Sequence, residues 1–223
     1  MSSIQAASRY VMRLDEEDPD DPSTPGEKPN KEDKKKGTEP SGGELEKRLF
    51  KERKILIFGE VNDVMAKEIT GKLLALAYDS TAPVDIYVNS PGGHVESGDT
   101  IHDMIRFVDS HAPVNMIGTG WVASAGALIF AAGHKKRRFC LPNTRFLLHQ
   151  PMGGVRGPAT DIDIEAREII KMRERLNHIF ARETGHSYEK IAKDTDRNYW
   201  MSAEEAIKYG LVTRIIHSFS DLK

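Results

Sequence analysis

The sequence predicts an α/β domain built on a parallel sheet. Short apolar runs of strand length alternate with longer stretches in which apolar residues recur at helical spacing. Such strand-helix repeats are typical of parallel sheets with right-handed crossovers. The chain has 223 residues, of which 39% are hydrophobic. It can therefore bury one core, and nothing in it indicates two.

Three consecutive repeats carry this pattern. Residues 55–58 form the first expected strand, and a helix over 62–78 follows it. Residues 84–88 lead through a glycine-rich turn into a second amphipathic helix. Residues 114–117 are the third expected strand, and they lead into a helix over 125–132.

The C-terminal part predicts further strands and a long helix. Strands are expected around 137–148. Residues 160–183 contain neither Pro nor Gly and predict a helix too long to be covered fully by a core of this size. The residues Ser202-Ala-Glu-Glu205 form a capping box that opens a last helix, and Gly210 is expected to cap its end.

A polar extension precedes the predicted domain of residues 44–223. Between Asp15 and Gly43 there is no aliphatic, aromatic or sulfur-containing side chain. Such a stretch cannot bury enough apolar area to offset its ordering entropy. We therefore expect residues 1–43 to be a disordered extension; because its charge changes from acidic to basic, an interaction tail is the alternative.

Charge and cysteine content narrow the functional classes. The formal net charge of −2 gives no global attraction to nucleic acid or to an anionic membrane. The single Cys140 cannot form an intrachain disulfide, and it is expected to be a small buried strand residue. No secretory leader and no run of 18 apolar residues is present, so a cytoplasmic location is expected.

Ser124 and His149 are the candidate catalytic pair. Ser124 lies among small residues at the junction between an expected strand and an expected helix, and His149 follows 25 residues later. Nucleophilic acyl transfer needs such a serine, a histidine to take its proton and backbone N–H groups to bind the oxyanion. The alternative is that Ser124 is a helix N-cap and His149 an ordinary strand-end residue.

Several sequence blocks together resemble one family. They include Asn89-Ser-Pro-Gly-Gly-His94, the segment Gly118–Ala127, His149-Gln-Pro-Met-Gly-Gly154 and Met201-Ser-Ala-Glu-Glu-Ala206. In this order they resemble the proteolytic subunit of the Clp ATP-dependent protease, the ClpP family, from about Leu45 to Ile216. The resemblance implies a ClpP/crotonase-like ββα superhelix with a protruding handle helix.

The resemblance also implies an assembly and partners. Heptameric rings stacked in pairs would enclose the active sites, and an AAA+ unfoldase of the Clp type would deliver polypeptide substrates. Asp196 and Arg197 match family positions that form ion pairs between rings. The family's apolar pocket for unfoldase loops is matched by Tyr87, Phe107, Ile117, Phe139 and Leu141. Asp85 and Thr119 occupy positions that are usually apolar or aromatic in the family, so docking is expected to be selective.

The same resemblance assigns the chemistry, with one departure. Ser124 matches the nucleophile, His149 the general base, and the N–H groups of Gly93 and Ala125 the oxyanion hole. Asn198 stands where the family has an aspartate. An asparagine carbonyl can orient the imidazole, but it cannot stabilise the imidazolium by charge, and Asp→Asn at this position of a serine-protease triad costs about 10⁴ in kcat.

Asn198 leaves a second interpretation open. It is a low-activity or non-catalytic structural subunit that assembles with an active paralogue. A crotonase-type acyl-CoA enzyme is a weaker alternative, because no acidic pair suited to hydration is present. His94 and His102 lack a third ligand at useful spacing and are expected to be surface histidines, so no metal is predicted. The Gly92-Gly93 turn lacks the Gly-Lys-Ser/Thr of a nucleotide-binding loop, and no cofactor is predicted.

Overall fold

The computed structural model describes residues 42–222, which form seven strands and seven α-helices. The expected extension 1–43 lies outside the described residues, apart from the two glycines that open α1. The elements are α1 (Gly42–Lys51), β1 (Lys54–Phe58), α2 (Asp63–Asp79), β2 (Val84–Ser90), α3 (Val95–Asp109), β3 (Val114–Ala123), α4 (Ala125–Ala131), η1 (Lys135–Arg137), β4 (Arg138–Cys140), β5 (Arg145–Leu148), α5 (Ala159–Thr184), α6 (Tyr188–Asp194), β6 (Tyr199–Met201), α7 (Ala203–Lys208), β7 (Arg214–Ile215) and η2 (Phe219–Leu222).

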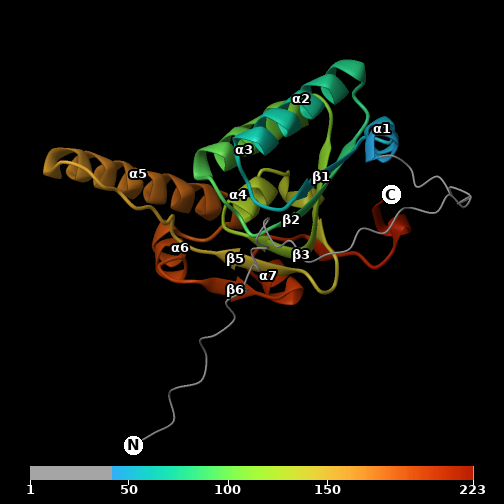
Figure 1. Cartoon of the computed structure of the whole chain (residues 1–223). Coiled ribbons are helices and arrows are strands. Elements are labelled where there is room, and N and C mark those ends of the chain that lie inside the picture. Colours follow the sequence, from blue (N-terminus) through green and yellow to red (C-terminus); the bar gives the residue numbers. More distant parts are fainter. Residues whose placement is uncertain (1–41, 223) are drawn as a thin grey trace, which may run out of the picture. The chain divides into compact units, whose positions relative to one another are not determined.

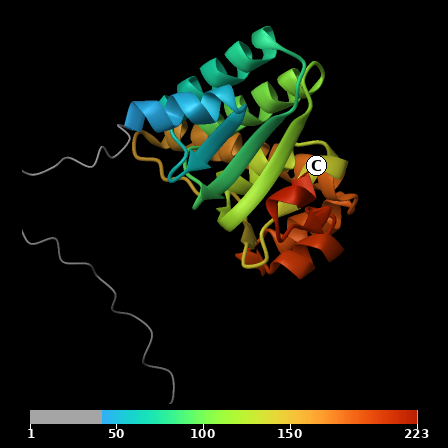
Figure 2. The same ribbon diagram turned by 90° about the vertical axis from the view of Figure 1, so that its right-hand side faces the viewer.

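The strands form one mixed sheet, in which five strands lie side by side in the order β1-β2-β3-β4-β7. The neighbours in this row are all parallel, as the strand-helix repeats predict. Figure 2 shows β1, β2 and β3 as neighbouring arrows that run in the same direction. β5 extends the sheet beside β3, and β6 pairs with β5 in the antiparallel sense.

β3 is longer than the predicted 114–117 and has two partners on one side. Its first half pairs with β4 at residues 116–118, and its second half pairs with β5 at residues 121–123. Gly120 separates the two halves with a φ of +60°, which an L side chain rarely adopts. A Cβ there would also lie 3.1 Å from the Asn89 side chain. The sequence pattern missed the second half because glycines and Thr119 interrupt its apolar run.

Helices α2, α3 and α4 pack against one another beside the sheet (Figure 1). The side chains of α2 that face the core are Ala66, Ile69, Leu73 and Leu76. α3 buries Ile101, Ile105 and Val108, and every residue of α4 is buried. Burial of such side chains contributes roughly 1.5–3 kcal/mol each before entropy is counted. The helix periods in the sequence therefore identify this layer correctly.

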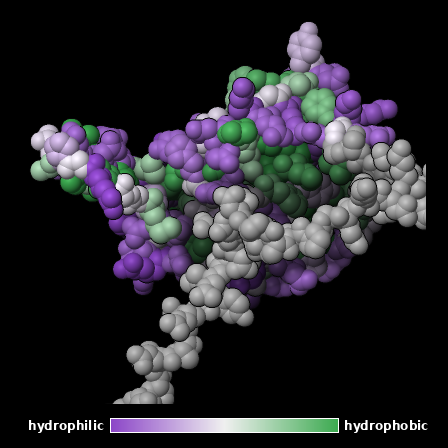
Figure 3. All heavy atoms as spheres, viewed as in Figure 1, coloured by the Kyte–Doolittle hydropathy of each residue, from purple (hydrophilic) through white to green (hydrophobic). Residues whose placement is uncertain are grey.

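α5 projects from the body of the domain (Figure 1). It spans 26 residues, close to the predicted 160–183, and only its C-terminal half contributes buried residues, among them Leu176 and Phe180. Figure 3 shows apolar residues mixed with hydrophilic ones on its projecting end. Ile162, Ile164 and Ile170 are between 43% and 56% exposed in this half of the helix. The single chain thus leaves the apolar side chains of the projecting half uncovered.

Two local predictions can be compared with the observed caps. The capping box is present at α7: Ser202 accepts from the Glu205 N–H, and the Glu205 side chain accepts from the Ser202 N–H. The end of this helix differs slightly from the prediction, because Tyr209 is its C-cap. Gly210 is the next residue and supplies the positive φ of +80° that ends many helices.

Candidate active site

Ser124 lies between β3 and α4 in a conformation that is unusual for serine. Its φ and ψ are +55° and −123°, and it occupies the N-cap position of α4. Its side chain makes no capping hydrogen bond, although capping is the usual reason for serine at this position. Backbone strain of this kind costs about 1–3 kcal/mol and is concentrated at functional sites. The hydroxyl of Ser124 is therefore left free for another role.

A glycine turn lies directly against this serine. A Cβ on Gly92 would come within 2.5 Å of the Ser124 Cβ and 3.0 Å of its Oγ. A Cβ on Gly93 would come within 2.2 Å of the Val61 carbonyl oxygen. Both glycines also have positive φ, so the turn requires them for space and for conformation.

The two residues predicted for the oxyanion hole flank the serine. The bridge between Val61 and Gly93 uses the Gly92 oxygen and the His94 N–H, and among the described residues the Gly93 N–H has no backbone acceptor. The Ala125 N–H belongs to the first turn of α4, where intrahelical acceptors are missing. The role of these two N–H groups as oxyanion donors stays a prediction.

The sheet register brings the three candidate triad residues together. On β5, Leu147 pairs with Ala123 of β3, so Ser124 follows the last pair of that ladder. The Ser124 N–H continues the ladder by donating to the Leu147 oxygen at 3.0 Å. On the other side Leu148 pairs with Tyr199 in the antiparallel β5-β6 ladder. The next residues along these two strands are His149 and Asn198, and they therefore meet at the end of the ladder.

Asn198 lies beside the imidazole of His149 at the end of this ladder. Burial lowers the pKa of His149 below its ordinary value, and the neighbouring Asn198 side chain opposes this by raising the pKa. Burial therefore favours the neutral ring, which can accept a proton.

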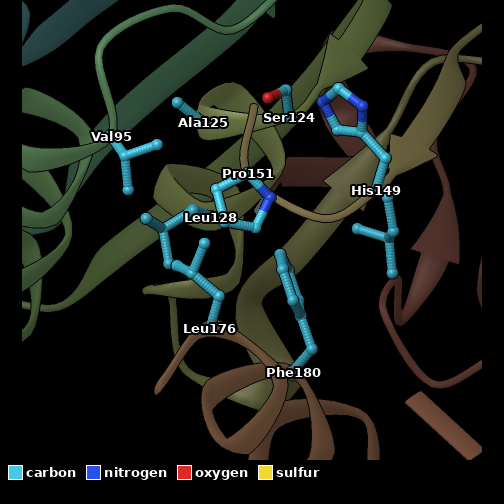
Figure 4. A pocket seen from close by; sticks show the side chains of 9 residues that line it. Val95, Ser124, Ala125, Leu128, His149, Pro151, Leu176 and Phe180 are labelled. Carbon is cyan, nitrogen blue, oxygen red and sulfur yellow. The ribbon is translucent and has the colours of Figure 1, made fainter. Parts of the chain in front are cut away.

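The serine and the histidine share one apolar pocket (Figure 4). Its other walls come from α3, α4, β5, the segment after β5, and α5: Val95, Ala125, Leu128, Leu148, Pro151, Leu176 and Phe180. The cavity measures about 20 Å³, which is room for about one water molecule. An apolar substrate side chain would therefore enter only after side chains such as Leu176 or Phe180 move.

Sequence reasoning missed these walls and one further residue. Leu176 and Phe180 have the helical spacing of ordinary core residues, so no local signal distinguishes them. Gln150 was also missed, although it follows His149 directly. Its backbone N–H donates to the Thr195 oxygen and its side-chain Nε2 to the Asp196 oxygen, both at 2.7 Å.

The predicted inter-ring residues lie in the same segment as Asn198. Asp196, Arg197 and Asn198 are all exposed in the described chain. Asp194 does not replace the missing triad carboxylate, because its Oδ2 accepts from the Tyr209 hydroxyl and from Lys190 Nζ, both at 2.7 Å. The carboxylate of Asp194 is therefore already used in holding α6 to the end of α7.

The five residues predicted for unfoldase docking fall into two groups. Ile117 and Phe139 are buried and form a small apolar cluster with Ile216, against which Tyr87 packs. Phe107 and Leu141 are exposed, at 68% and 38%. Ile216 and Leu222 complete the cluster, and the sequence analysis did not name them. Asp85, the polar departure beside this group, is paired with Lys54 at 3.3 Å.

One histidine prediction is wrong. His102 is 2% exposed, and its Nδ1 lies 2.8 Å from the Leu128 carbonyl oxygen. It faces the α3-α4 contact because it lies one turn from both Gly98, which faces Ala125 and Leu128, and Ile105. Burial lowers its pKa. His94 is exposed and hydrogen-bonds Ser97 at 2.8 Å, and the described residues contain no group of three potential metal ligands.

Cys140 is buried in β4, as expected of a small strand residue. Burial raises the pKa of its thiol to about 12, so the thiolate is not populated at neutral pH. Within residues 42–222, no helix combines the length and the hydrophobicity needed to cross a bilayer. The candidate chemistry therefore rests on Ser124, His149 and Asn198.

The fold and this arrangement define a class of protein: a protein with a mostly parallel α/β sheet that presents a serine hydroxyl and an imidazole in one pocket. The family model described as Clp protease matches residues 37–219. The chain belongs to the Clp protease family, and it has the ClpP fold.

Individual relatives agree with this assignment. The ATP-dependent Clp protease proteolytic subunit 2 of Gluconobacter oxydans is 74% identical over 211 residues, which cover 95% of this chain and 92% of the relative. Proteolytic subunit 3 of Rhizobium etli is 62% identical over 183 residues, covering 82% and 93%. The solved structure of ClpP1 from Listeria monocytogenes has a TM-score of 0.72 at 50% identity, covering 80% of this chain and 99% of that one. These similarities support a peptidase.

Proposed function

We propose that this chain is a serine-type endopeptidase subunit of a self-compartmentalised Clp protease. The observation that carries the proposal is the strained, uncapped Ser124 in one pocket with His149, whose ring lies beside Asn198. The turn of Gly92 and Gly93 admits no side chain and lies against the serine, which supports the proposed oxyanion hole. A serine that served only as a helix N-cap would need neither a strained backbone nor a histidine in the same pocket.

The mechanism follows from the positions of these groups. Ser124 Oγ attacks the peptide carbonyl carbon while His149 takes the hydroxyl proton. The N–H groups of Gly93 and Ala125 stabilise the oxyanion that forms. His149 then protonates the leaving amine, and a water molecule activated by the same ring releases the acyl group. The apolar pocket favours substrates with an apolar side chain before the cleaved bond.

Asn198 determines the expected rate. It orients the imidazole, but it supplies no charge opposite the imidazolium. We therefore propose a peptidase of reduced intrinsic activity. No hydrogen bond joins Ser124 to the His149 ring among the described residues, and such bonds often tighten only when substrate binds.

The assembly and the partners are proposed on the same basis. Heptameric rings stacked in pairs would cover the exposed isoleucines of α5 and bring Asp196 and Arg197 to the contact between rings. An AAA+ unfoldase would dock on the group of Tyr87, Ile117 and Phe139, with Phe107 and Leu141 exposed beside it. Polypeptides are the proposed substrates, and the cytoplasm is the proposed location.

Asn198 also favours a second candidate function. A subunit with little or no activity would contribute structure to rings shared with an active paralogue. The change Asn198→Asp in this chain would separate the two candidates.

A fluorophosphonate probe tests the proposed nucleophile. The purified full chain should gain one probe adduct on the peptide that contains Ser124, and Ser124→Ala should abolish it. Asn198→Ala should retain the adduct but form it more slowly, because the hydroxyl remains and the ring loses its acceptor. Labelling that persists in Ser124→Ala would mean that another residue is the nucleophile.

A further inference from the structure

Gln150 links the two segments that carry His149 and Asn198. It follows His149, and the segment 195–198 lies opposite it. Two hydrogen bonds of 2.7 Å cross between them: from the Gln150 backbone N–H to the Thr195 oxygen, and from its side-chain Nε2 to the Asp196 oxygen. The second bond reaches the residue that lies two positions before Asn198.

The two ends of this segment are held differently from its middle. Thr195 is 1% exposed, and its hydroxyl oxygen lies 2.8 Å from the Ile191 carbonyl oxygen and 3.0 Å from Asn177 Oδ1. Tyr199 is fixed by its pairing with Leu148. Residues 196–198 between them are exposed. An exposed three-residue stretch loses conformational entropy when it is ordered, at about 1–2 kcal/mol per residue, so a hydrogen bond inside it affects where Asn198 lies.

The Gln150 amide can bind in only one orientation. Its Nε2 faces the Asp196 carbonyl oxygen, which can only accept. Its Oε1 faces Arg173 Nη1 of α5 at 3.5 Å, which can only donate. A reversed amide would lose both interactions, so the side chain acts as a directional bridge. The hydrogen bond that Oε1 accepts is long and therefore weak, whereas the hydrogen bond that Nε2 donates is short.

We propose that Gln150 is a positioning residue that holds the Asn198 carbonyl against the His149 ring through the Asp196 backbone. The proposal rests on the catalytic roles proposed above for His149 and Asn198. Asparagine binds the imidazole by a neutral hydrogen bond alone, without the charge of an aspartate. Its contribution therefore depends more steeply on distance and angle, and the bridge of Gln150 controls both.

The test compares Gln150→Met with Arg173→Met in the assembled full chain. Methionine has nearly the volume of glutamine and no charge, so Gln150→Met removes the donor without adding an electrostatic effect on His149. Loss of one such hydrogen bond should lower kcat about tenfold with little change in KM. Arg173→Met removes only the partner of Oε1, and it should change kcat by less than about threefold.

A double-variant cycle separates positioning from general structural damage. If Gln150 acts through Asn198, then Gln150→Met combined with Asn198→Ala should be no slower than Asn198→Ala alone. Additive losses in the double variant would overturn the proposal. A change in KM as large as the change in kcat would also overturn it. The active fraction of Gln150→Met is measured separately by probe labelling, because unfolded chains lower the apparent kcat without changing KM.

A chemical readout of His149 does not depend on peptidase activity. Diethyl pyrocarbonate modifies the neutral imidazole, so its rate against pH, followed by mass spectrometry of the His149 peptide, reports the pKa of this ring. Without its acceptor the ring should titrate at lower pH, and Gln150→Met should shift the profile in the same direction as Asn198→Ala. An unshifted profile contradicts the positioning role. A wild-type chain with no peptidase activity but with these shifts would contradict only the proposed function.

Discussion

At the scale of single residues, the chemistry depends on the charge state of His149. A general base works only when its ring is neutral. Burial lowers the pKa of His149, and Asn198 offsets part of that effect without a charge. The base should therefore remain neutral at a lower pH than an ordinary histidine with a pKa near 6.5.

The pH profile of kcat/KM tests this directly. For the wild-type chain the acid limb should lie below about pH 6.5. Asn198→Asp places a carboxylate beside the ring and favours the imidazolium, so the acid limb should move to higher pH. Peptide hydrolysis measured between pH 5 and 8 gives the acid limb of the wild-type chain and the acid limb of Asn198→Asp. An acid limb that stays in place in Asn198→Asp would show that residue 198 does not contact the base in solution.

Gly92 provides a second prediction at this scale. Gly92→Ala would place a Cβ 2.5 Å from the Ser124 Cβ and force either the turn or the serine to move. We expect at least a hundredfold loss of kcat, on the order of the loss of one oxyanion donor. Gly71→Ala is the control, because nothing lies within 4 Å of the added methyl in α2. It should keep full activity and stabilise the chain by about 0.5–1 kcal/mol.

At the scale of elements, the sequence predicted the helix periods and the first strands well, but it could not predict the register. Ser124 and His149 are recognisable because small residues and a strand end surround them. The meeting of His149 with Asn198 depends on the pairing of β5 with β6, two strands that α5 and α6 separate along the chain. Gln150 was missed for the same reason. His102 was predicted at the surface because helical spacing within α3 does not show that α4 packs over this residue.

Glu183 explains how the end of α5 is fixed. It is 4% exposed and is contacted by Arg106 at 3.0 Å and Arg182 at 2.8 Å, with the buried Arg138 behind it. The Arg138 side chain also donates to the Glu183 backbone oxygen at 2.9 Å. Without the carboxylate, the charge of Arg138 is buried with no other ion-pair partner within residues 42–222.

Removing this carboxylate should therefore be costly. Glu183→Ala should lower the free energy of unfolding by about 3–5 kcal/mol, the usual cost of breaking a buried ion pair from one side. Denaturant unfolding of the variant measures it. Glu174→Ala, an exposed acid on the same helix, is the control and should stay within about 0.5 kcal/mol of wild type. Equal effects of the two variants would contradict the role given to Glu183.

The projecting half of α5 supplies a prediction about assembly. Ile164 is 52% exposed, so Ile164→Asp leaves the core of the single chain unchanged. If α5 packs against another subunit, the aspartate buries an unpaired charge there and should shift the protein to smaller species. Mass photometry at micromolar concentration measures the distribution. Glu165→Gln, its exposed neighbour, should leave the distribution as in wild type; a wild-type-like Ile164→Asp would place α5 outside the interface.

At the scale of the whole molecule, the account joins assembly to chemistry. A single chain with three exposed isoleucines on a projecting helix has an apolar surface that an assembly would cover. The segment of Asp196, Arg197 and Asn198 carries both the proposed ring contact and the proposed triad residue. Activity is therefore best measured on a defined oligomer, where a change in rate cannot be confused with a change in assembly.

The most direct test of the central claim is peptide hydrolysis by Asn198→Asp, compared with the wild-type chain and Ser124→Ala in the same high-mass oligomer fraction. Restoring the carboxylate supplies the charge opposite the imidazolium, so kcat should rise above wild type, by up to about 10⁴. Ser124→Ala should be inactive in an oligomer of unchanged size. An Asn198→Asp oligomer of the same size that hydrolyses peptide no faster than Ser124→Ala would contradict the account and favour the structural subunit.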